Sequence, residues 1–384
     1  MTRKLSILEA TSIIVGAGIG GGVMAVPFLA SRSGIPAFLM VIVTAAILNI
    51  GINLLLADVA VRDGRHLQIL ELMRDYVFRS RTGAAISWIF FVLLGVSFLA
   101  SLTAYIDGAG RVLADLTDWP VTASQLGVYG LSAGIVFLGL KGVGISETLG
   151  IVFLVVFCAL IGLGSAQSWV NPWTIPSGSA VRSTETLALY GVVMYSLNAA
   201  FAVPQAVKGL EGDRGKTTSA IVAGTLLNAV VVTIITFVAM AVSNPVTKVA
   251  VIGISNAAGP LVSVSSSLFV ILAMLTTYWS VSLALADIIT QRTGLGTRRA
   301  WAVASLPTVL LIIFGVFDFI QYLQIAGGIV ALVVMFVTVP MFLTARKERI
   351  IQNPIVRLGP WSTGILLTVL TVGMLLMTVG SLVG

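Results

Sequence analysis

The residues whose types and spacing could do chemistry lie in the first apolar stretch, where five glycines fall within seven residues, Gly16 to Gly22. No charged residue lies between Glu9 and Arg32, and Pro27 follows the glycines. Glycine in a helix interior is about 1 kcal/mol less favourable than alanine, so this run predicts a broken helix rather than a plain membrane anchor. Backbone amides and carbonyls freed at such a break can bind a polar solute where they line a cavity.

A zwitterion, which carries a carboxylate and an ammonium group, fits such a break. The amides of 20–23 begin the second half-helix and would face the carboxylate, with the helix dipole adding up to about 2 kcal/mol. The ammonium would meet carbonyls near Ala17 and in the segment 195–198. The alternative interpretation is close helix packing, because small residues are also typical of contact faces between membrane helices.

A second set of oxygen atoms lies in the eighth apolar stretch, where Ala273 precedes Thr276 and Thr277. Neighbouring hydroxyls one turn beyond a free carbonyl can complete an oxygen cage for a small hard cation. The alternative is that each threonine bonds back to its own helix or to a neighbouring helix.

Catalysis has few residues to use. The single histidine, His66, lies among charged residues, and the single cysteine, Cys158, lies in an apolar stretch where we interpret it as core packing. We therefore predict no enzyme and no cofactor. The acidic residues nearest the apolar stretches fall at their expected ends, where we expect solvated or structural roles: Asp58, Asp107, Glu147 and Asp287.

Hydrophobic residues make up 58% of the 384 residues and charged residues 10%, with a mean hydropathy of +1.06. This composition excludes an ordinary soluble protein and predicts an all-α integral membrane protein. Apolar runs of about 20 residues cross a bilayer, and they predict about eleven transmembrane helices here. These lie near 8–31, 36–58, 84–107, 124–140, 146–166, 184–208, 219–242, 260–287, 299–316, 319–344 and 360–383.

The basic residues are divided unevenly between the connections. Of the 22, one side of the predicted membrane holds only Arg32, Arg111, Arg182 and Lys248. The positive-inside rule therefore predicts a multi-pass protein of the cell membrane with a cytoplasmic N-terminus and, for an odd span count, an outer C-terminus. The segment 62–81 also contains a periodic apolar run, which predicts an amphipathic cytoplasmic helix on the membrane face.

A short internal repeat links spans one and six. Met24–Pro27 (Met-Ala-Val-Pro) recurs as Phe201–Pro204 (Phe-Ala-Val-Pro), and an offset of five spans makes the two cross in opposite directions. Paired broken helices of opposite direction are typical of inverted-repeat transporters, whose binding site lies near the midplane. We predict a single transporter domain over 1–384, with repeats at 8–166 (helices 1 to 5) and 184–344 (helices 6 to 10) and helix 11 at 360–383.

Two stretches resemble a known family. Thr103–Gly110 (Thr-Ala-Tyr-Ile-Asp-Gly-Ala-Gly) resembles the T-A-Y-I-x-G-x-G string of the hydroxy and aromatic amino acid permeases, and Gly16–Pro27 resembles their G-x-x-x-G-x-G-x-x-x-x-P region. The span count and the span-six proline are similar to the wider amino acid and auxin permease group. These families belong to the amino acid, polyamine and organocation superfamily. The resemblance implies a five-plus-five inverted repeat with discontinuous helices 1 and 6, plus one extra helix, working by alternating access.

The resemblance also implies which residues bind ligands. The substrate would be held by Ala17, Gly20, Gly21, Gly22, Tyr105, Asn198, Ala199 and Phe201. The sodium site shared by related symporters uses two span-one carbonyls and an A-x-x-T-[ST] pattern on span eight. The matching positions here are Val15, Gly18, Ala273, Thr276 and Thr277.

Two departures from the family shape the final prediction. Span six reads Asn-Ala-Ala over 198–200, where aromatic permeases tend to carry a bulkier Phe-His-Gly string, so we predict an amino acid importer without assigning an aromatic preference. Span five, over 148–166, lacks the lysine that some proton-coupled members place at the sodium position, so we predict sodium symport. The alternative is a proton-coupled aromatic amino acid permease. A channel and a non-transporting amino acid sensor are alternatives of another class. The expected partners are an amino acid and the lipid bilayer, without nucleic acid, and a monomer suffices.

Overall fold

The structure is a computed structural model in which every regular element of the described residues is a helix. Seven of these helices are long and apolar enough to cross a membrane, or eight when one bent pair is taken as a single span. The described residues are 5–19, 22–65, 67–138, 183–243, 260–317, 319–348 and 354–383, with several residues between 150 and 163 and between 245 and 254.

The unbroken helices agree with the predicted spans to within a few residues at most ends. The principal exception is the third span, which was expected to end at residue 107 but continues to Thr117. The helices are α3 (Ile35–Asp63), α5 (Arg81–Thr117), α6 (Val121–Phe137), α10 (Arg214–Val242), α12 (Pro260–Thr293), α13 (Thr297–Phe314), α14 (Phe319–Glu348) and α15 (Pro360–Val383). The predicted fifth span, 146–166, lies largely outside the described residues, so the total of eleven stays a prediction.

The first predicted span is two helices, α1 (Ile7–Gly18) and α2 (Gly22–Ser33), which meet at an angle of 56°. A capping box begins α1, because the Ser6 side chain accepts a hydrogen bond from the Glu9 amide while the Glu9 carboxylate accepts one from the Ser6 amide. The break falls within the glycine run, as the sequence predicts.

The sixth predicted span is also interrupted. Helix α8 (Ser183–Ser196) ends before a non-helical segment, Leu197–Ala202, and α9 (Val203–Gly209) follows it. Pro204 lies in the first turn of α9, where its missing amide leaves no helical hydrogen bond unmade. Both spans that carry the Ala-Val-Pro string are therefore discontinuous in the structure.

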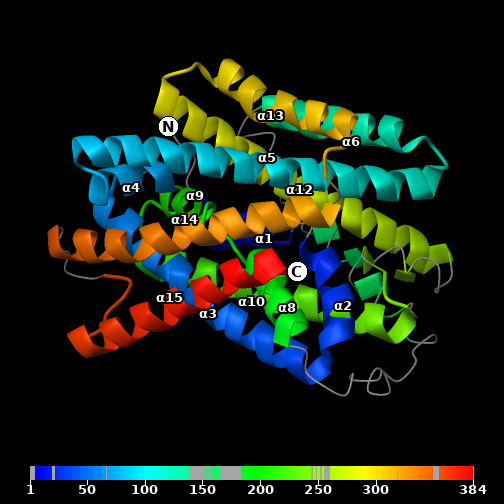
Figure 1. Ribbon diagram of the computed structural model, residues 1–384, viewed down its shortest axis with the longest axis horizontal. Helices are drawn as coiled ribbons and strands as arrows, with labels where there is room; N and C mark the ends of the chain where they lie inside the picture. The colour runs from blue at the N-terminus through cyan, green and yellow to red at the C-terminus, as the bar shows by residue number, and fades with distance from the viewer. Residues whose placement is uncertain are drawn as a thin grey trace.

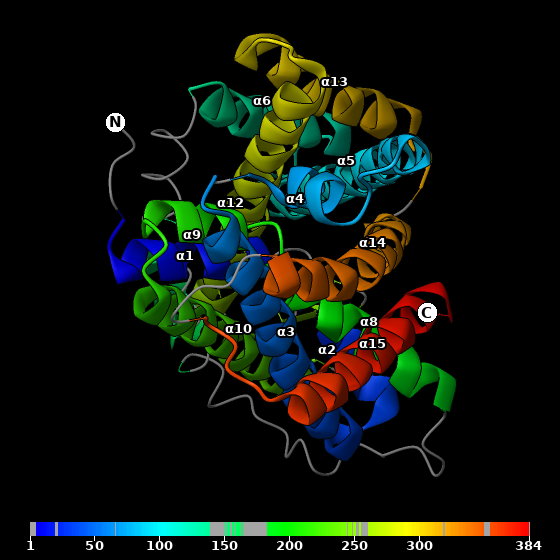
Figure 2. The same ribbon diagram turned by 90° about the vertical axis from the view of Figure 1, so that its left-hand side faces the viewer.

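The broken helices lie inside a shell of long ones. Helix α1 packs against α10 and α12, and α2 packs against α8 and α10. Helix α5 runs along α12 and α14, while α15 covers α8 and α14 (Figure 1). Helices α6 and α13 contact each other at the edge opposite α3, α10 and α15 (Figure 2). This arrangement brings both breaks next to the middle of α5.

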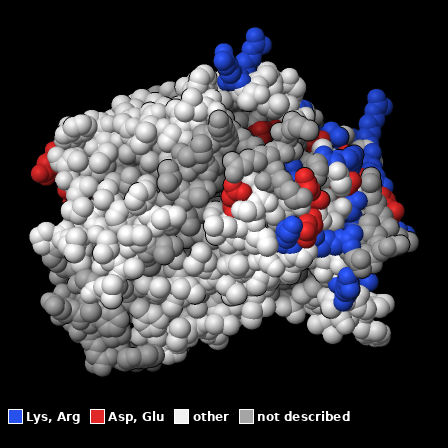
Figure 3. All heavy atoms as spheres, turned by 180° about the vertical axis from the view of Figure 1, so that it is seen from behind, with Lys and Arg blue, Asp and Glu red and all other residues white. Residues whose placement is uncertain are grey.

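The short helix α4 (Ile69–Tyr76) exists as predicted, but its predicted position on the membrane face is wrong. Leu70, Leu72 and Met73 are buried, and α4 packs against α3, α5, α12 and α14. Its apolar side therefore faces these four helices. Lysine and arginine side chains gather at one end of the molecule in Figure 3.

Candidate functional site

A cavity of about 50 Å³, here called the central cavity, lies where the two breaks face α5, α12 and α14. The predicted substrate residues Ala17, Gly22, Tyr105, Asn198, Ala199 and Phe201 all line it. Gly20 and Gly21 lie outside the described residues. The full lining is Ala17, Gly18, Gly22, Phe98, Ser101, Tyr105, Tyr195, Ser196, Asn198, Ala199, Phe201, Val281 and Val330.

The first break depends on a close approach between α2 and α8. A Cβ atom added at Gly22 would lie 2.8 Å from the Cβ of Ser196 and 3.2 Å from its Cα. Such distances leave no room for a side chain at residue 22, since part of the obstacle is backbone. The glycine thus lets the start of α2 reach the end of α8, and the two breaks share one wall.

The second break is held by a side chain rather than by glycine. The Oδ1 atom of Asn198 accepts a hydrogen bond from the Ala200 amide at 2.9 Å. The carbonyl of Ala199 accepts from the amides of Ala202 and Val203 and so starts the turn into α9. Because the asparagine satisfies an amide that has left the helix, the chain can stay open here at low cost.

Aromatic side chains surround the central cavity. The rings of Phe98 and Phe201 meet edge to face with centroids 4.7 Å apart. The Tyr195 hydroxyl forms hydrogen bonds with Ser101 at 2.8 Å and with Tyr105 at 3.2 Å. Ser101 and the Tyr195 side chain were not among the predicted site residues, which included only the Tyr195 backbone. Ser101 lies four residues before Tyr105 on the same face of α5, and this spacing is the signal that could have identified Ser101.

The central cavity has no charged side chain among its described lining residues. A charged side chain at the centre of a membrane costs at least about 2.5–3.5 kcal/mol, and an uncharged lining avoids this cost. Recognition of a charged group would then depend on backbone dipoles and on hydroxyls such as those of Tyr105 and Tyr195. Among the described lining residues, only the tyrosines carry a titratable group, so the arrangement favours binding of a polar solute over acid–base chemistry.

The predicted sodium residues lie where α12 crosses the end of α1. The Thr277 hydroxyl lies 2.9 Å from the carbonyls of both Gly16 and Ala273, and the Thr276 hydroxyl donates to Ala273 at 3.0 Å. The Val15 carbonyl accepts from the Ile19 amide at 3.0 Å. The two hydroxyls are therefore engaged with the carbonyls of Ala273 and Gly16, and Gly16 was not among the predicted ligands. Gly18 lines the central cavity.

The predicted fifth span passes the same point. A Cβ atom added at Gly150 would lie 2.4 Å from Cγ2 of Thr276, so the two residues are in direct contact. In the proton-coupled members described above, a lysine of this span takes the place of the sodium ion, and such a lysine would have to lie at this contact. The described residues of this segment carry no basic side chain.

Solved transporters share the fold at low sequence identity. A manganese transporter of Eremococcus coleocola, bound to an aromatic bis-isothiourea compound, superposes with a TM-score of 0.68 at 16% identity, covering 98% of this chain and 89% of that one. MHP1, a nucleobase-cation-symport-1 family transporter with bromovinylhydantoin bound, superposes with a TM-score of 0.66 at 13% identity, covering 99% of this chain and 92% of that one. MhsT in complex with L-phenylalanine superposes with a TM-score of 0.62 at 14% identity, covering 100% of this chain and 99% of that one. These similarities show the fold alone.

Comparison with curated protein sequences gives no significant match. The sequence does match the tryptophan/tyrosine permease family over residues 3–380, nearly its whole length. The match confirms the resemblance seen in the glycine run and in Thr103–Gly110. It also supports the aromatic alternative, which the small residues at 198–200 had left open, over the main prediction of an amino acid importer without a stated preference. The chain belongs to the tryptophan/tyrosine permease family, and it is a multi-pass membrane permease for aromatic amino acids, not an enzyme.

Proposed function

We propose that the chain imports tryptophan and tyrosine by cation-coupled alternating access, with the amino acid bound in the central cavity. The observation that carries the proposal is that two helix breaks and an aromatic wall meet at one uncharged cavity. The repeats proposed for it are 8–166 and 184–344, with 360–383 as the extra helix. The N-terminus would lie in the cytoplasm, in accordance with the distribution of basic residues.

The two breaks would hold the two charges of the amino acid. Amides at the start of α2 would bind the carboxylate, since a helix N-terminus favours negative charge. The ammonium would bind carbonyls near Ala17 and in the segment 195–198. The indole or phenol ring would lie against Phe98 and Phe201, and the polar atom of that ring would reach the hydroxyls of Tyr105 and Tyr195.

Binding requires the cavity to expand. The central cavity measures about 50 Å³, whereas ligand sites usually measure about 300–1,000 Å³. The Phe98 and Phe201 rings contact each other at this cavity. We infer that rotation of these rings accompanies substrate binding.

The coupling ion in this proposal is sodium. Hydroxyl and carbonyl oxygens suit a hard cation, and Thr277 already links α12 to the end of α1. An ion that replaced this hydrogen bond would bind beside Gly18, which also lines the central cavity. Ion and amino acid would then stabilise the same segment, so each would raise the affinity for the other by the same factor.

The test is uptake of labelled tryptophan into liposomes carrying the purified protein, under a sodium gradient or a proton gradient. We expect saturable uptake driven by sodium. Thr277→Val should raise the half-saturating sodium concentration about tenfold, because an unpaired buried partner costs about 1–3 kcal/mol. Thr236→Val is the matched control, since Thr236 is also buried but bonds only within its own helix, to Val232.

Each outcome of this test has a distinct meaning. Uptake driven by the proton gradient alone would overturn the sodium assignment and would support the alternative, a proton-coupled aromatic amino acid permease. Unsaturable flux would indicate a channel, and binding without flux would indicate a sensor. An equal effect of the two threonine variants would remove Thr277 from the ion site.

A further inference from the structure

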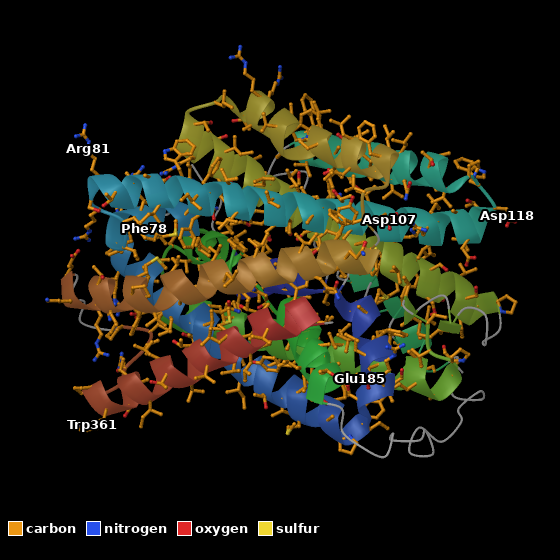
Figure 4. All side chains as sticks on the ribbon, viewed as in Figure 1. Phe78, Arg81, Asp107, Asp118, Glu185 and Trp361 are labelled. Atoms are coloured by element: carbon orange, nitrogen blue, oxygen red, sulfur yellow. The ribbon has the colours of Figure 1, made fainter. Side chains whose placement is uncertain are left out.

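A second cavity, of about 450 Å³, lies between the C-terminal half of α5, the start of α6 and the connection from α13 to α14. We call it the α5–α6 cavity. Its volume is within the usual range for ligand sites. Asp107, which lines it, lies on the half of the molecule toward Asp118 and away from Arg81 (Figure 4). It shares no lining residue with the central cavity.

Helix α5 separates the two cavities. Residues two positions apart on a helix point in nearly opposite directions, at about 100° per residue. Ser101 and Tyr105 line the central cavity, whereas Thr103, Asp107 and Arg111 line the α5–α6 cavity. The string Thr103–Gly110 therefore serves both faces, and the proposed central site uses only one of them.

The floor of the α5–α6 cavity is a buried carboxylate. Asp107 is 6% exposed, and it accepts a hydrogen bond from Nε2 of Gln125 at 2.6 Å. The Nε atom of Arg111 lies 3.0 Å from both carboxylate oxygens. A Cβ atom at Gly110 would lie 2.7 Å from the Cα of Gln125, so the glycine is what lets α6 approach α5 this closely. The helix contact is thus shaped around a polar cluster.

The guanidinium of Arg111 keeps unused donors. Its hydrogen bonds to described residues all use Nε, and its side chain is 52% exposed. An arginine fork binds carboxylates through two parallel hydrogen bonds. The lining also includes an aromatic wall, formed by Phe317 and Tyr322, whose rings meet edge to face with centroids 5.5 Å apart. The cavity therefore presents a cation, an anion and an aromatic surface together.

A purely structural ion pair explains less of this arrangement. An ion pair four residues apart on one helix contributes about 0.3–0.5 kcal/mol and needs no third partner. It does not account for Gln125, for the hollow beside the guanidinium or for the aromatic wall. These three features together are what a zwitterionic aromatic ligand would use.

We propose that the α5–α6 cavity is a second binding site for an aromatic amino acid. Its carboxylate binds the terminal nitrogens of Arg111, its ammonium binds the carboxylate of Asp107, and its ring lies against Phe317 and Tyr322. The identity of this ligand rests on the proposed function. The site lies off the central cavity, so it can hold a solute molecule while the central cavity is closed.

The test is the number of tritiated tryptophan molecules bound per protein in lipid nanodiscs, by equilibrium dialysis. We expect two for the unaltered chain and one for Arg111→Gln. Ala17→Leu should also bind one, because the larger side chain fills the central cavity, and the double variant should bind none. Arg81→Gln is the matched control for loss of an arginine at the other end of α5, and it should bind two.

The outcomes separate this inference from the proposed function. One molecule bound by both the unaltered chain and Arg111→Gln, but none by Ala17→Leu, would overturn the second site and leave the central one. One molecule lost in Arg111→Gln but kept in Ala17→Leu would support this site and overturn the central one. No binding to the unaltered chain would overturn both. If Arg111→Gln does not melt at the same temperature as the unaltered protein, Arg111→Lys replaces it. This variant should bind two molecules, with the affinity of the α5–α6 cavity at least fivefold lower than in the unaltered chain. An unchanged affinity would overturn the role of the guanidinium.

Discussion

The central cavity, about 50 Å³, lies between broken helices and has no charged residue in its described lining, whereas the α5–α6 cavity, about 450 Å³, holds Asp107 and Arg111 between unbroken ones. Depth explains the difference. A side-chain charge in mid-membrane is costly, so the deep cavity depends on backbone dipoles exposed by two breaks. Nearer the end of α5, the buried carboxylate of Asp107 is neutralised by Arg111, whose side chain is 52% exposed. The same kind of solute would then be recognised by two different means.

The sharpest way to break this comparison is to disturb the helix approach on which the deep cavity depends. Gly22→Ala should reduce tryptophan uptake about 10- to 100-fold, because overpacking against Ser196 costs about 1–3 kcal/mol. Gly95→Ala on α5 is the control, since a Cβ there meets no atom within 4 Å. Uptake rates at matched protein amounts in the membrane measure the effect. Normal uptake by Gly22→Ala would show that the contact between α2 and α8 does not shape the site.

A smaller effect should separate the aromatic wall of the central cavity from ordinary packing. Phe201→Leu removes the ring contact with Phe98, and such pairs contribute about 0.5–1.5 kcal/mol. The preference for tryptophan over leucine should therefore fall about 2- to 10-fold, measured by competition with unlabelled leucine. Phe237→Leu removes the edge contact with Phe38 away from the cavity and should leave the preference unchanged. A fall in both variants would assign the effect to general loosening.

The smallest expected effect concerns salt. The Arg111 side chain is half exposed, so charges in the α5–α6 cavity are screened over about 10 Å at 0.1 M salt. Raising potassium chloride tenfold at constant sodium should weaken binding there about two- to threefold and leave the central cavity unaffected. Ala17→Leu and Arg111→Gln isolate the two sites for this measurement. Equal salt dependence would mean that the cavities recognise charge in the same way.

The sequence predicted the elements better than their contacts. Hydrophobic length located the unbroken helices, and the Ala-Val-Pro repeat located both interruptions, because these signals are local. The end of the third span was wrong: Asp107 was expected at a helix end, but α5 continues to Thr117. Its charge is tolerated there through Arg111 and Gln125, and Gln125 belongs to another helix. A hydropathy pattern contains no information about such a partner.

The candidate site shows the same division. Residues that motif resemblance indicated, such as Tyr105 and Asn198, line the central cavity. Ser101 and the side chain of Tyr195 were missed, because their hydrogen bond joins residues 94 positions apart. The burial of α4 was missed for a related reason. An amphipathic helix shows which side is apolar but not whether lipid or protein covers it.

A cavity of only about 50 Å³ between the breaks also has a consequence for the membrane, because it leaves little room for water. A continuous file of water would let protons and salts run down their gradients whenever the protein was unloaded. The contact between the Phe98 and Phe201 rings at the cavity would interrupt such a file. Leakage of ions through the permease would then depend on how often Phe98 and Phe201 separate without a solute between them.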